Sequence, residues 1–394
     1  MKTFVNATTS KLDVYPMERL FNIKKSLIKE NKKVYDFGIG DPKLPLWTPI
    51  VEAVRNSVET TLGYPTIGGL DELYDAQKDY LKRRFNLSLD PGKSLLIPTR
   101  GSKEAIFHIA LSLVGRSNKK TIAYPTPGYP VYESSALFCG ATTYPINLNQ
   151  KNNYRVEPWN LDSSVVKDLC ALWVNYPHNP TGTSVNSSYW ENLVSWCQKN
   201  DVVLLSDECY SDLYDHRFDS EEHKHLRPTT PLSFSTDKIL SFFSLSKRSG
   251  FTGLRAGFIA GDINILKPHL KARANFGLAS PTCIQKGATV AWKDDRHVEE
   301  RRKILSERMN LAFTELKKLD MIEKKPEIPF YIWAKIPDHV KQDDITFCLN
   351  LAQKGVITTP ARWLGSQEKN YIRFSLTQDK KNMMEAFKIL QTLL

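Results

Sequence analysis

One lysine stands where a buried strand is expected to end. Lys247 follows the apolar run ILSFFSL at residues 239–245, and Arg255 comes eight residues after it. An ammonium group in a desolvated site, or beside another cation, loses its proton more readily than one in water. The neutral amine is then a nucleophile that attacks a carbonyl carbon and forms a Schiff base. The position of Lys247 therefore predicts covalent chemistry with a carbonyl compound.

Hydroxyl and guanidinium donors surround this lysine. Ser244, Ser246 and Arg255 carry groups that suit a phosphate. Upstream, TRGSKEA at 99–105 places Gly-Ser-Lys at the start of an expected helix, where free N–H groups and the helix dipole attract anions. An ordinary cap by Ser102 is the alternative explanation. A carbonyl compound that also carries a phosphate points to pyridoxal 5'-phosphate.

Two further motifs place polar groups directly after expected strands. Asp207 follows the apolar run VVLLS, and a buried carboxylate there is costly unless a cation pairs with it. The ring nitrogen of pyridoxal phosphate stays protonated beside an anion, and Asp207 is the available anion. In NYPHNPTG at 175–182 the turn exposes Asn179. A simple turn for Asn179 and a helix cap for Asp207 remain alternatives.

The elements that must hold these residues alternate between apolar strands and amphipathic helices. Helices are expected at 102–115, 131–140 and 187–200, and strands at TIAYP, LCALWVNYP, DVVLLSDE, KILSFFSL and GLRAGFIAG. Short apolar runs separated by helices predict a mostly parallel sheet that is covered on both faces. Ligands bind beyond the carboxyl ends of such strands, where the polar motifs lie. This pattern predicts a large α/β domain at residues 46–285.

The end of the chain has a different pattern. A long amphipathic helix is expected at 296–319, followed by alternating strands at 329–336 and 370–376. We therefore expect residues 286–394 to form a smaller α+β domain together with residues 1–45.

Length and charge limit the class of protein. With 394 residues, 41% of them hydrophobic, the chain is long enough for two domains. The net charge of +11 comes from 54 basic and 43 acidic residues. These charges are dispersed, and the densest cluster, EERRKILSER, mixes both signs, so we expect no nucleic-acid partner.

Cysteine spacing and hydropathy bear on the compartment. The six cysteines are far apart and have no histidine at ligand spacing, which predicts reduced thiols and no metal site. No apolar run approaches the roughly 20 residues that span a bilayer. The first residues also lack the apolar core of a signal peptide. A cytoplasmic protein without a membrane partner is expected.

Taken in order, the motifs resemble those of a known enzyme family. The segments GSKEA, PTPGYPVY, NPTG, SDECYSDLY, SLSKRSGFTGLRAG and YIRFSL resemble class I aminotransferases of pyridoxal-phosphate fold type I, over almost the whole chain. The resemblance implies a mostly parallel seven-stranded sheet flanked by helices, plus the smaller α+β domain. YPMERL, IGDPKLP, YPTIGGLDEL and FYIWAK are similar to the bacterial succinyldiaminopimelate aminotransferases.

The resemblance also implies a role for each motif residue. Lys247 would bind the cofactor covalently and later move the proton from the substrate Cα. Asp207 would pair with the ring nitrogen, Tyr210 and Asn179 would hydrogen-bond the ring hydroxyl oxygen, and Tyr129 would stack on the ring. The implied phosphate ligands are Gly101, Ser102, Lys103, Ser244, Ser246 and Arg255.

On the substrate side, Arg373 would bind the α-carboxylate with its planar guanidinium, beside Asn179 and the Gly40 backbone. Tyr15 would line the entrance. Tyr64 would reach the phosphate of the neighbouring subunit, which implies a homodimer with shared active sites.

A few residues depart from the family pattern or stand near it. Ile328 and Pro329 in EIPFY, and Ala361 in TTPARWLG, replace small residues in the region expected to shape the substrate pocket. His108 and His178 lie near the motifs without an evident partner, so a structural role is expected for both.

The implied activity is ping-pong transamination between an amino acid and a 2-oxo acid, with N-succinyl-LL-2,6-diaminopimelate and 2-oxoglutarate as the expected pair. An aspartate, aromatic or LL-diaminopimelate aminotransferase is an alternative. A carbon–sulfur β-lyase would share every cofactor residue but release pyruvate and ammonia. A regulatory protein with an aminotransferase-like domain carries a DNA-binding domain as well, for which a pattern that begins within 40 residues leaves no room.

Overall fold

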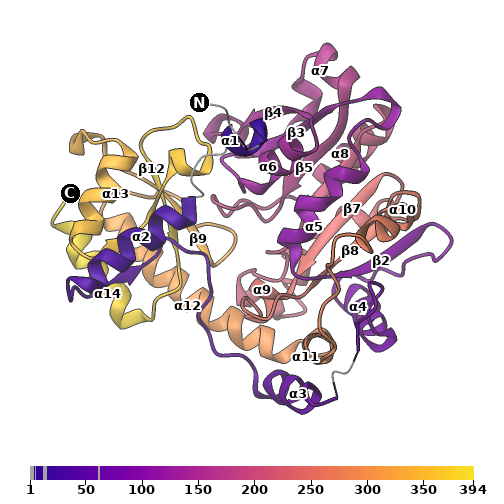
Figure 1. The fold of residues 1–394 in the computed structure, drawn as a ribbon. Coiled ribbons are helices and arrows are strands. Elements are labelled where there is room, and N and C mark those ends of the chain that lie inside the picture. The colour runs from indigo at the N-terminus through magenta and orange to yellow at the C-terminus, as the bar shows by residue number, and fades with distance from the viewer. Residues whose placement is uncertain (1–3, 5, 12–15, 61–62) are drawn as a thin grey trace.

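A seven-stranded sheet forms the centre of the larger part of the protein (Figure 1). The computed structural model describes residues 4, 6–11, 16–60 and 63–394. β8 runs antiparallel to both of its neighbours, and the other six strands share one direction. The strands follow one another as β2 (Ser94–Thr99), β8 (Gly257–Asp262), β7 (Ile239–Ser244), β6 (Val203–Asp207), β5 (Leu169–Asn175), β3 (Thr121–Thr126) and β4 (Thr142–Asn147).

Helices cover both faces of this sheet, as the unbroken apolar strands require. Every residue of β5, β6 and β7 is buried. One face packs against α3 (Thr48–Val58), α4 (Asp71–Phe85), α8 (Ser187–Lys199) and α11 (Thr282–Lys293). The opposite face packs against α5 (Ser102–Ile109), α6 (Val131–Phe138) and α10 (Ile263–Arg273). The short helices α7 (Ser163–Asp168) and α9 (Leu245–Arg248) lead into β5 and out of β7.

Both ends of the chain contribute to a second, smaller layer with its own core (Figure 1). Three antiparallel strands stand in the order β11 (Thr359–Pro360), β12 (Tyr371–Ser375) and β9 (Tyr331–Lys335), and β1 (Tyr35–Asp36) pairs in parallel with β10 (Val356–Ile357). The remaining helices are α1 (Ala7–Lys11), α2 (Pro16–Lys29), α12 (Arg296–Lys318), α13 (Asp344–Gln353) and α14 (Lys380–Gln391).

The large domain is predicted to begin after residue 45, and that boundary stays a prediction. The second boundary, predicted after residue 285, lies further along the chain if the packing of α11 is considered. Ala288, Ala291 and Trp292 of α11 are buried in the core that covers the large sheet. We therefore propose that the small domain begins at α12 rather than at residue 286.

The α/β fold with a mostly parallel sheet is confirmed, as are the strands and helices that the apolar pattern predicts. Two edge strands, β2 and β4, escape that pattern. Each carries a proline, Pro98 or Pro145, which an edge strand tolerates because one side of it lacks a partner. β4 is also partly exposed along its whole length, so it shows no apolar run.

Candidate active site

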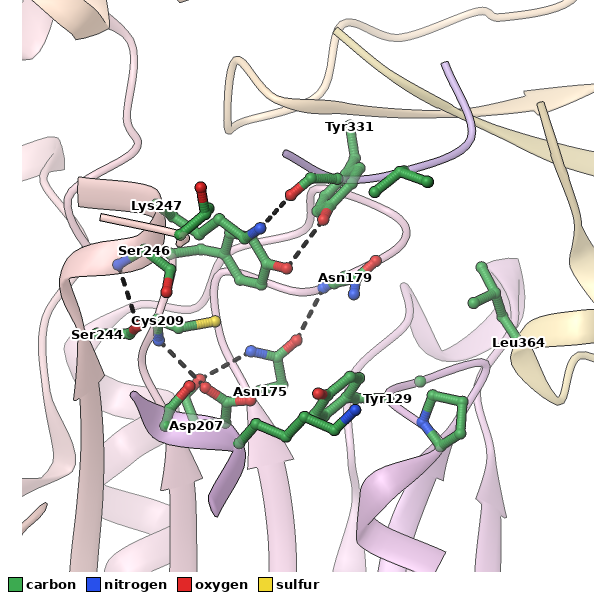
Figure 2. A pocket seen from close by; sticks show the side chains of 18 of the residues that line it. Tyr129, Asn175, Asn179, Asp207, Cys209, Ser244, Ser246, Lys247, Tyr331 and Leu364 are labelled. Atoms are coloured by element: carbon green, nitrogen blue, oxygen red, sulfur yellow. Dashed lines mark hydrogen bonds between the residues drawn. The ribbon is translucent and has the colours of Figure 1, made fainter. Parts of the chain in front are cut away.

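The carboxyl ends of the central strands open into a cavity of about 220 Å3 between the large sheet and the small domain (Figure 2). Polar side chains that follow β5, β6 and β7 line it, and strands β9 and β12 form the opposite wall. The sequence-predicted residues that line it are Gly40, Ser102, Lys103, Tyr129, Asn179, Asp207, Tyr210, Ser244, Ser246, Lys247, Arg255 and Arg373. Two described residues that the sequence predicts for the site, Gly101 and Tyr64, are outside the lining.

Lys247 lies on the one-turn helix α9, directly after β7. Ser244 ends the strand and caps this turn, since its hydroxyl accepts a hydrogen bond from the Ser246 backbone N–H at 3.2 Å. The Lys247 ammonium points into the cavity and donates to the Gly40 carbonyl (Figure 2). Burial, together with the nearby guanidiniums of Arg373 and Arg255, lowers the pKa of Lys247 to about 8. The amine is therefore close to losing its proton at neutral pH, as a nucleophile requires.

An anion cradle forms where α5 begins. Gly101 occupies the N-cap position with φ +78°, and no side chain caps the helix, so the alternative of an ordinary cap by Ser102 does not hold. A Cβ atom on Gly101 would lie 2.6 Å from Nη2 of Arg255, so only glycine allows this approach. Arg255 in turn donates to the Ser246 hydroxyl at 3.1 Å. Burial and the charge of Arg255 lower the pKa of Lys103.

Asp207 ends β6 with its carboxylate only 3% exposed. The Tyr132 hydroxyl donates to one carboxylate oxygen at 2.7 Å, and the Cys209 N–H donates to the other at 3.2 Å. Despite these donors, burial raises the pKa of Asp207. A cation in the cavity would offset that cost, so the position suits a protonated ring nitrogen.

A chain of hydrogen bonds joins the ends of β5 and β6 to the small domain. The Asn175 side chain donates to the Asp207 carbonyl at 2.8 Å and accepts from the Asn179 N–H at 2.9 Å. The Asn179 side-chain oxygen accepts from Arg373 of β12 at 2.9 Å. Arg373 also donates to the Gly38 carbonyl at 2.6 Å, while its buried Nε has no acceptor among the described residues. A carboxylate ligand would satisfy that donor.

Tyr331 of β9 is the main site residue that motif reasoning misses. Its hydroxyl lies 2.9 Å from that of Tyr210, and its ring lies under the Arg373 guanidinium, 4.7 Å from ring centroid to Cζ. A Cβ atom on Gly40 would collide with the Tyr331 hydroxyl, which explains the glycine there. Burial raises the pKa of Tyr210 well above its usual value, so this hydroxyl keeps its proton and can donate.

The comparison with known proteins decides the family. Residues 32–390 match the family described as aminotransferase class I and II. The chain belongs to this family. It is 30% identical over 380 residues to an LL-diaminopimelate aminotransferase of Aquifex aeolicus, with 95% of each chain covered. It is 28% identical over 392 residues to one of Syntrophobacter fumaroxidans, with 97% of each chain covered.

Solved structures agree with this assignment. The aminotransferase AspB from Helicobacter pylori matches with a TM-score of 0.84 and 31% identity, over 97% of this chain and 98% of that one. An aminotransferase from Neisseria meningitidis matches with a TM-score of 0.87 and 29% identity, over 99% and 100%. The protein is therefore a pyridoxal-phosphate-dependent aminotransferase of fold type I.

The lining of the aminotransferase fits this cofactor. The uncapped start of α5, Ser246 and Arg255 offer donors to a phosphate, Asp207 offers an anion to a ring nitrogen, and Lys247 offers an amine to an aldehyde. The individual roles stay predictions. The motifs NYPHNPTG, PTPGYPVY and SDECYSDLY contain Asn175, Tyr132 and Cys209, but they predict no role for these three residues.

The remaining predicted residues lie elsewhere. Tyr64 is fully exposed and outside the cavity of its own chain. Tyr15 lies outside the described residues. Ile328, Pro329 and Ala361 are buried and do not line this cavity, so their influence on the substrate pocket stays a prediction.

The two histidines are held by structural contacts. His178 is fully buried between the Thr181 hydroxyl at 2.8 Å and the Pro127 carbonyl at 3.1 Å, and burial lowers its pKa to about 3. His108 lies 2.7 Å from the Glu104 carbonyl and stacks on Phe276. Neither lines the cavity.

Among the helices that the structure describes, none is long and apolar enough to cross a membrane.

Proposed function

We propose that this aminotransferase moves an amino group between N-succinyl-LL-2,6-diaminopimelate and 2-oxoglutarate by a ping-pong mechanism. The observation that carries the substrate proposal is the charge of the lining. Its described residues include one carboxylate, Asp207, which lies beside the Asn175 amide at the ends of the strands. An α-amino acid with a second, positively charged amino group would find no carboxylate for its distal end among the other described residues of this lining. The succinyl amide removes that positive charge.

The lining residues would divide the work between substrate and cofactor. When bound, pyridoxal phosphate supplies the carbonyl group and the electron-withdrawing ring. Arg373 would hold the substrate α-carboxylate through its unsatisfied Nε, and Asn179 would fix the guanidinium. Lys247, as a neutral amine, would take the proton from the substrate Cα and deliver it to C4′, the carbonyl carbon of the cofactor. The negative Asp207 carboxylate would stay beside the ring nitrogen and keep it protonated throughout the reaction.

Water exclusion supports the same reaction. Tyr331 and Leu364 cover the cavity from the small domain, on the side opposite the strand ends (Figure 2). If bound cofactor and substrate displace water from the cavity, the interaction between Arg373 and a carboxylate becomes stronger. The four cations among the described lining residues are Lys103, Lys247, Arg255 and Arg373, and each has a proposed partner. The succinyl carboxylate would therefore bind beyond these four cations rather than to one of them.

A second candidate substrate is unsuccinylated LL-2,6-diaminopimelate. It is favoured by the names of the relatives from Aquifex aeolicus and Syntrophobacter fumaroxidans. At 30% and 28% identity, these relatives leave room for a different side-chain pocket on the same cofactor site.

We also propose a homodimer in which Tyr64, exposed in the single chain, completes the site of the neighbouring subunit.

The test is a comparison of kcat/KM with 2-oxoglutarate as the acceptor. The amino donors are the succinylated and free diaminopimelates, aspartate, phenylalanine and acetylornithine. We expect the succinylated compound to exceed the others by about tenfold or more, a preference of roughly 1.4 kcal/mol in transition-state binding. A tenfold preference for the free diaminopimelate would transfer the proposal to the second candidate. A separate assay with cystathionine tests the β-lyase alternative, which release of pyruvate and ammonia without an acceptor would indicate.

A further inference from the structure

A second cavity, of about 490 Å3, shares no lining residue with the active-site cavity. Three segments form most of its wall: residues 184–187 at the start of α8, residues from the 214–229 loop, and residues 325–328 before β9. Arg155 completes the lining. The same arginine also lines an adjoining cavity of about 560 Å3, so its side chain stands between the two spaces.

The lining carries more positive than negative charge. Four side chains, Arg155, Arg217, Arg227 and Lys325, are permanent cations, whereas two, Asp215 and Glu327, are carboxylates. Clefts lined by one sign of charge concentrate ions of the opposite sign. The cavity therefore favours an anion.

Three of the four cations already have partners in the protein. Asp215 accepts from Arg217 at 2.9 Å and from Lys325 at 3.0 Å. Arg227 donates to the backbone carbonyls of Phe218 and Asp219 at 2.6 and 2.9 Å. Arg155 interacts electrostatically with Glu327, but its buried Nε has no hydrogen-bond acceptor among the described residues. A buried donor without an acceptor costs free energy that a bound anion would recover.

Three further donors lie at or next to the wall of this cavity. The hydroxyl of Thr229, in the lining, is buried and has no hydrogen-bond partner among the described residues. Helix α8, 13 residues long, begins at the wall, and the Asn186 side chain caps the N–H of Tyr189. The backbone N–H groups of Ser187 and Ser188 in the first turn stay available to a ligand.

We propose that this cavity binds a small phosphate-type dianion, with Arg155 as its principal ligand. A tetrahedral anion has several oxygens, which match a planar guanidinium, a hydroxyl and helix N–H groups together. The site adjoins the catalytic loops, since the Ser184 N–H donates to Glu327 at 3.0 Å. Ser184 follows Asn179 in the chain, and Glu327 precedes Tyr331. A bound anion would therefore bridge the segment that carries Asn179 and the segment that carries Tyr331. The inference does not depend on the identity of the amino acid substrate.

The test measures binding of inorganic phosphate to the holoenzyme by titration calorimetry. The cofactor is first reduced onto the enzyme with borohydride, so that the phosphate site of the active centre stays filled, and sodium chloride holds the ionic strength constant. We expect one saturable site, weakened about tenfold or more by Arg155→Met and less by Thr229→Val.

A matched control is Lys324→Met, which removes a cation from the adjoining cavity only. This variant should bind phosphate as the unmodified enzyme does. All three variants should keep their melting temperature within a few degrees, so that a loss of binding reports the site. Absence of saturable heat, or equal binding by Arg155→Met and the unmodified enzyme, would overturn the proposal and leave a water-filled cavity.

Discussion

The guanidinium of Arg373 donates to the side-chain oxygen of Asn179 at 2.9 Å, although 194 residues separate them in the chain. Arg373 belongs to the small antiparallel sheet, and Asn179 follows the central strand β5 of the large one. The bond therefore fixes the distance between the two domains at the point where a substrate carboxylate would bind. Each residue orients the other, and the motifs alone do not give the bond between them.

Arg373→Lys should raise KM for the amino acid with a smaller effect on kcat. Lysine keeps the charge but loses the planar fork that reaches Asn179 and a carboxylate together. One charge-assisted hydrogen bond contributes about 2 kcal/mol, which corresponds to roughly thirtyfold in kcat/KM. Steady-state kinetics with both substrates check this, and an unchanged KM would show that the α-carboxylate binds elsewhere.

Lys247 should be the residue that carries the cofactor. The purified enzyme should absorb visible light, and borohydride should fix the cofactor to the peptide that contains Lys247, as mass spectrometry of a digest can show. Lys247→Ala should abolish turnover yet keep its melting temperature, since the phosphate donors Ser246 and Arg255 remain. A reduced adduct on another lysine would contradict the assignment.

The reactivity of Lys247 should follow its pKa of about 8. In apoenzyme below that pH the side chain is an ammonium, so the rate constant for recombination with pyridoxal phosphate should rise about tenfold per pH unit and level off above pH 8. The folded-state pKa lies below the usual 10.5, so between about pH 8 and 10.5 the unfolded chain binds more protons. This group therefore makes apoenzyme more stable as the pH rises through that interval, which denaturant titrations can measure.

The sequence predicts the centre of the site better than its rim. Asp207 and Lys247 were found because apolar strands end at them, and such ends meet at one edge of a parallel sheet. The pairing of Tyr331 with Tyr210 and the orphan Nε of Arg373 depend on how the small domain packs, which periodicity does not encode. The alternative of a Ser102 cap does not hold for a related reason, since Gly101 approaches Arg255 closely and takes the cap position itself.

Asp207→Asn should cost rate far more than stability. Asparagine is nearly isosteric and can still accept from Tyr132, but it cannot keep a ring nitrogen protonated, so kcat should fall about a hundredfold or more. Because burial raises the pKa of Asp207, its removal should leave the melting temperature nearly unchanged or raised. The half-exposed Asp201, which pairs with Arg116 and Lys238, offers a control: Asp201→Asn should keep normal kcat. Near-normal turnover of Asp207→Asn would exclude the ring-nitrogen role.

Tyr64 should act across a subunit interface. Its side chain is fully exposed in the single chain, whereas Lys247 and Arg373 line one cavity of that chain. Lys247→Ala and Tyr64→Ala should each be inactive alone. After subunit exchange, half of the dimers would be hybrids with one intact site of two, so about a quarter of the normal activity should return. A mixture of Lys247→Ala with Arg373→Gln is the control, and it should stay inactive because both changes affect residues of one chain's cavity. Sedimentation of the active enzyme as a monomer, or equal recovery in the two mixtures, would refute a site shared between subunits.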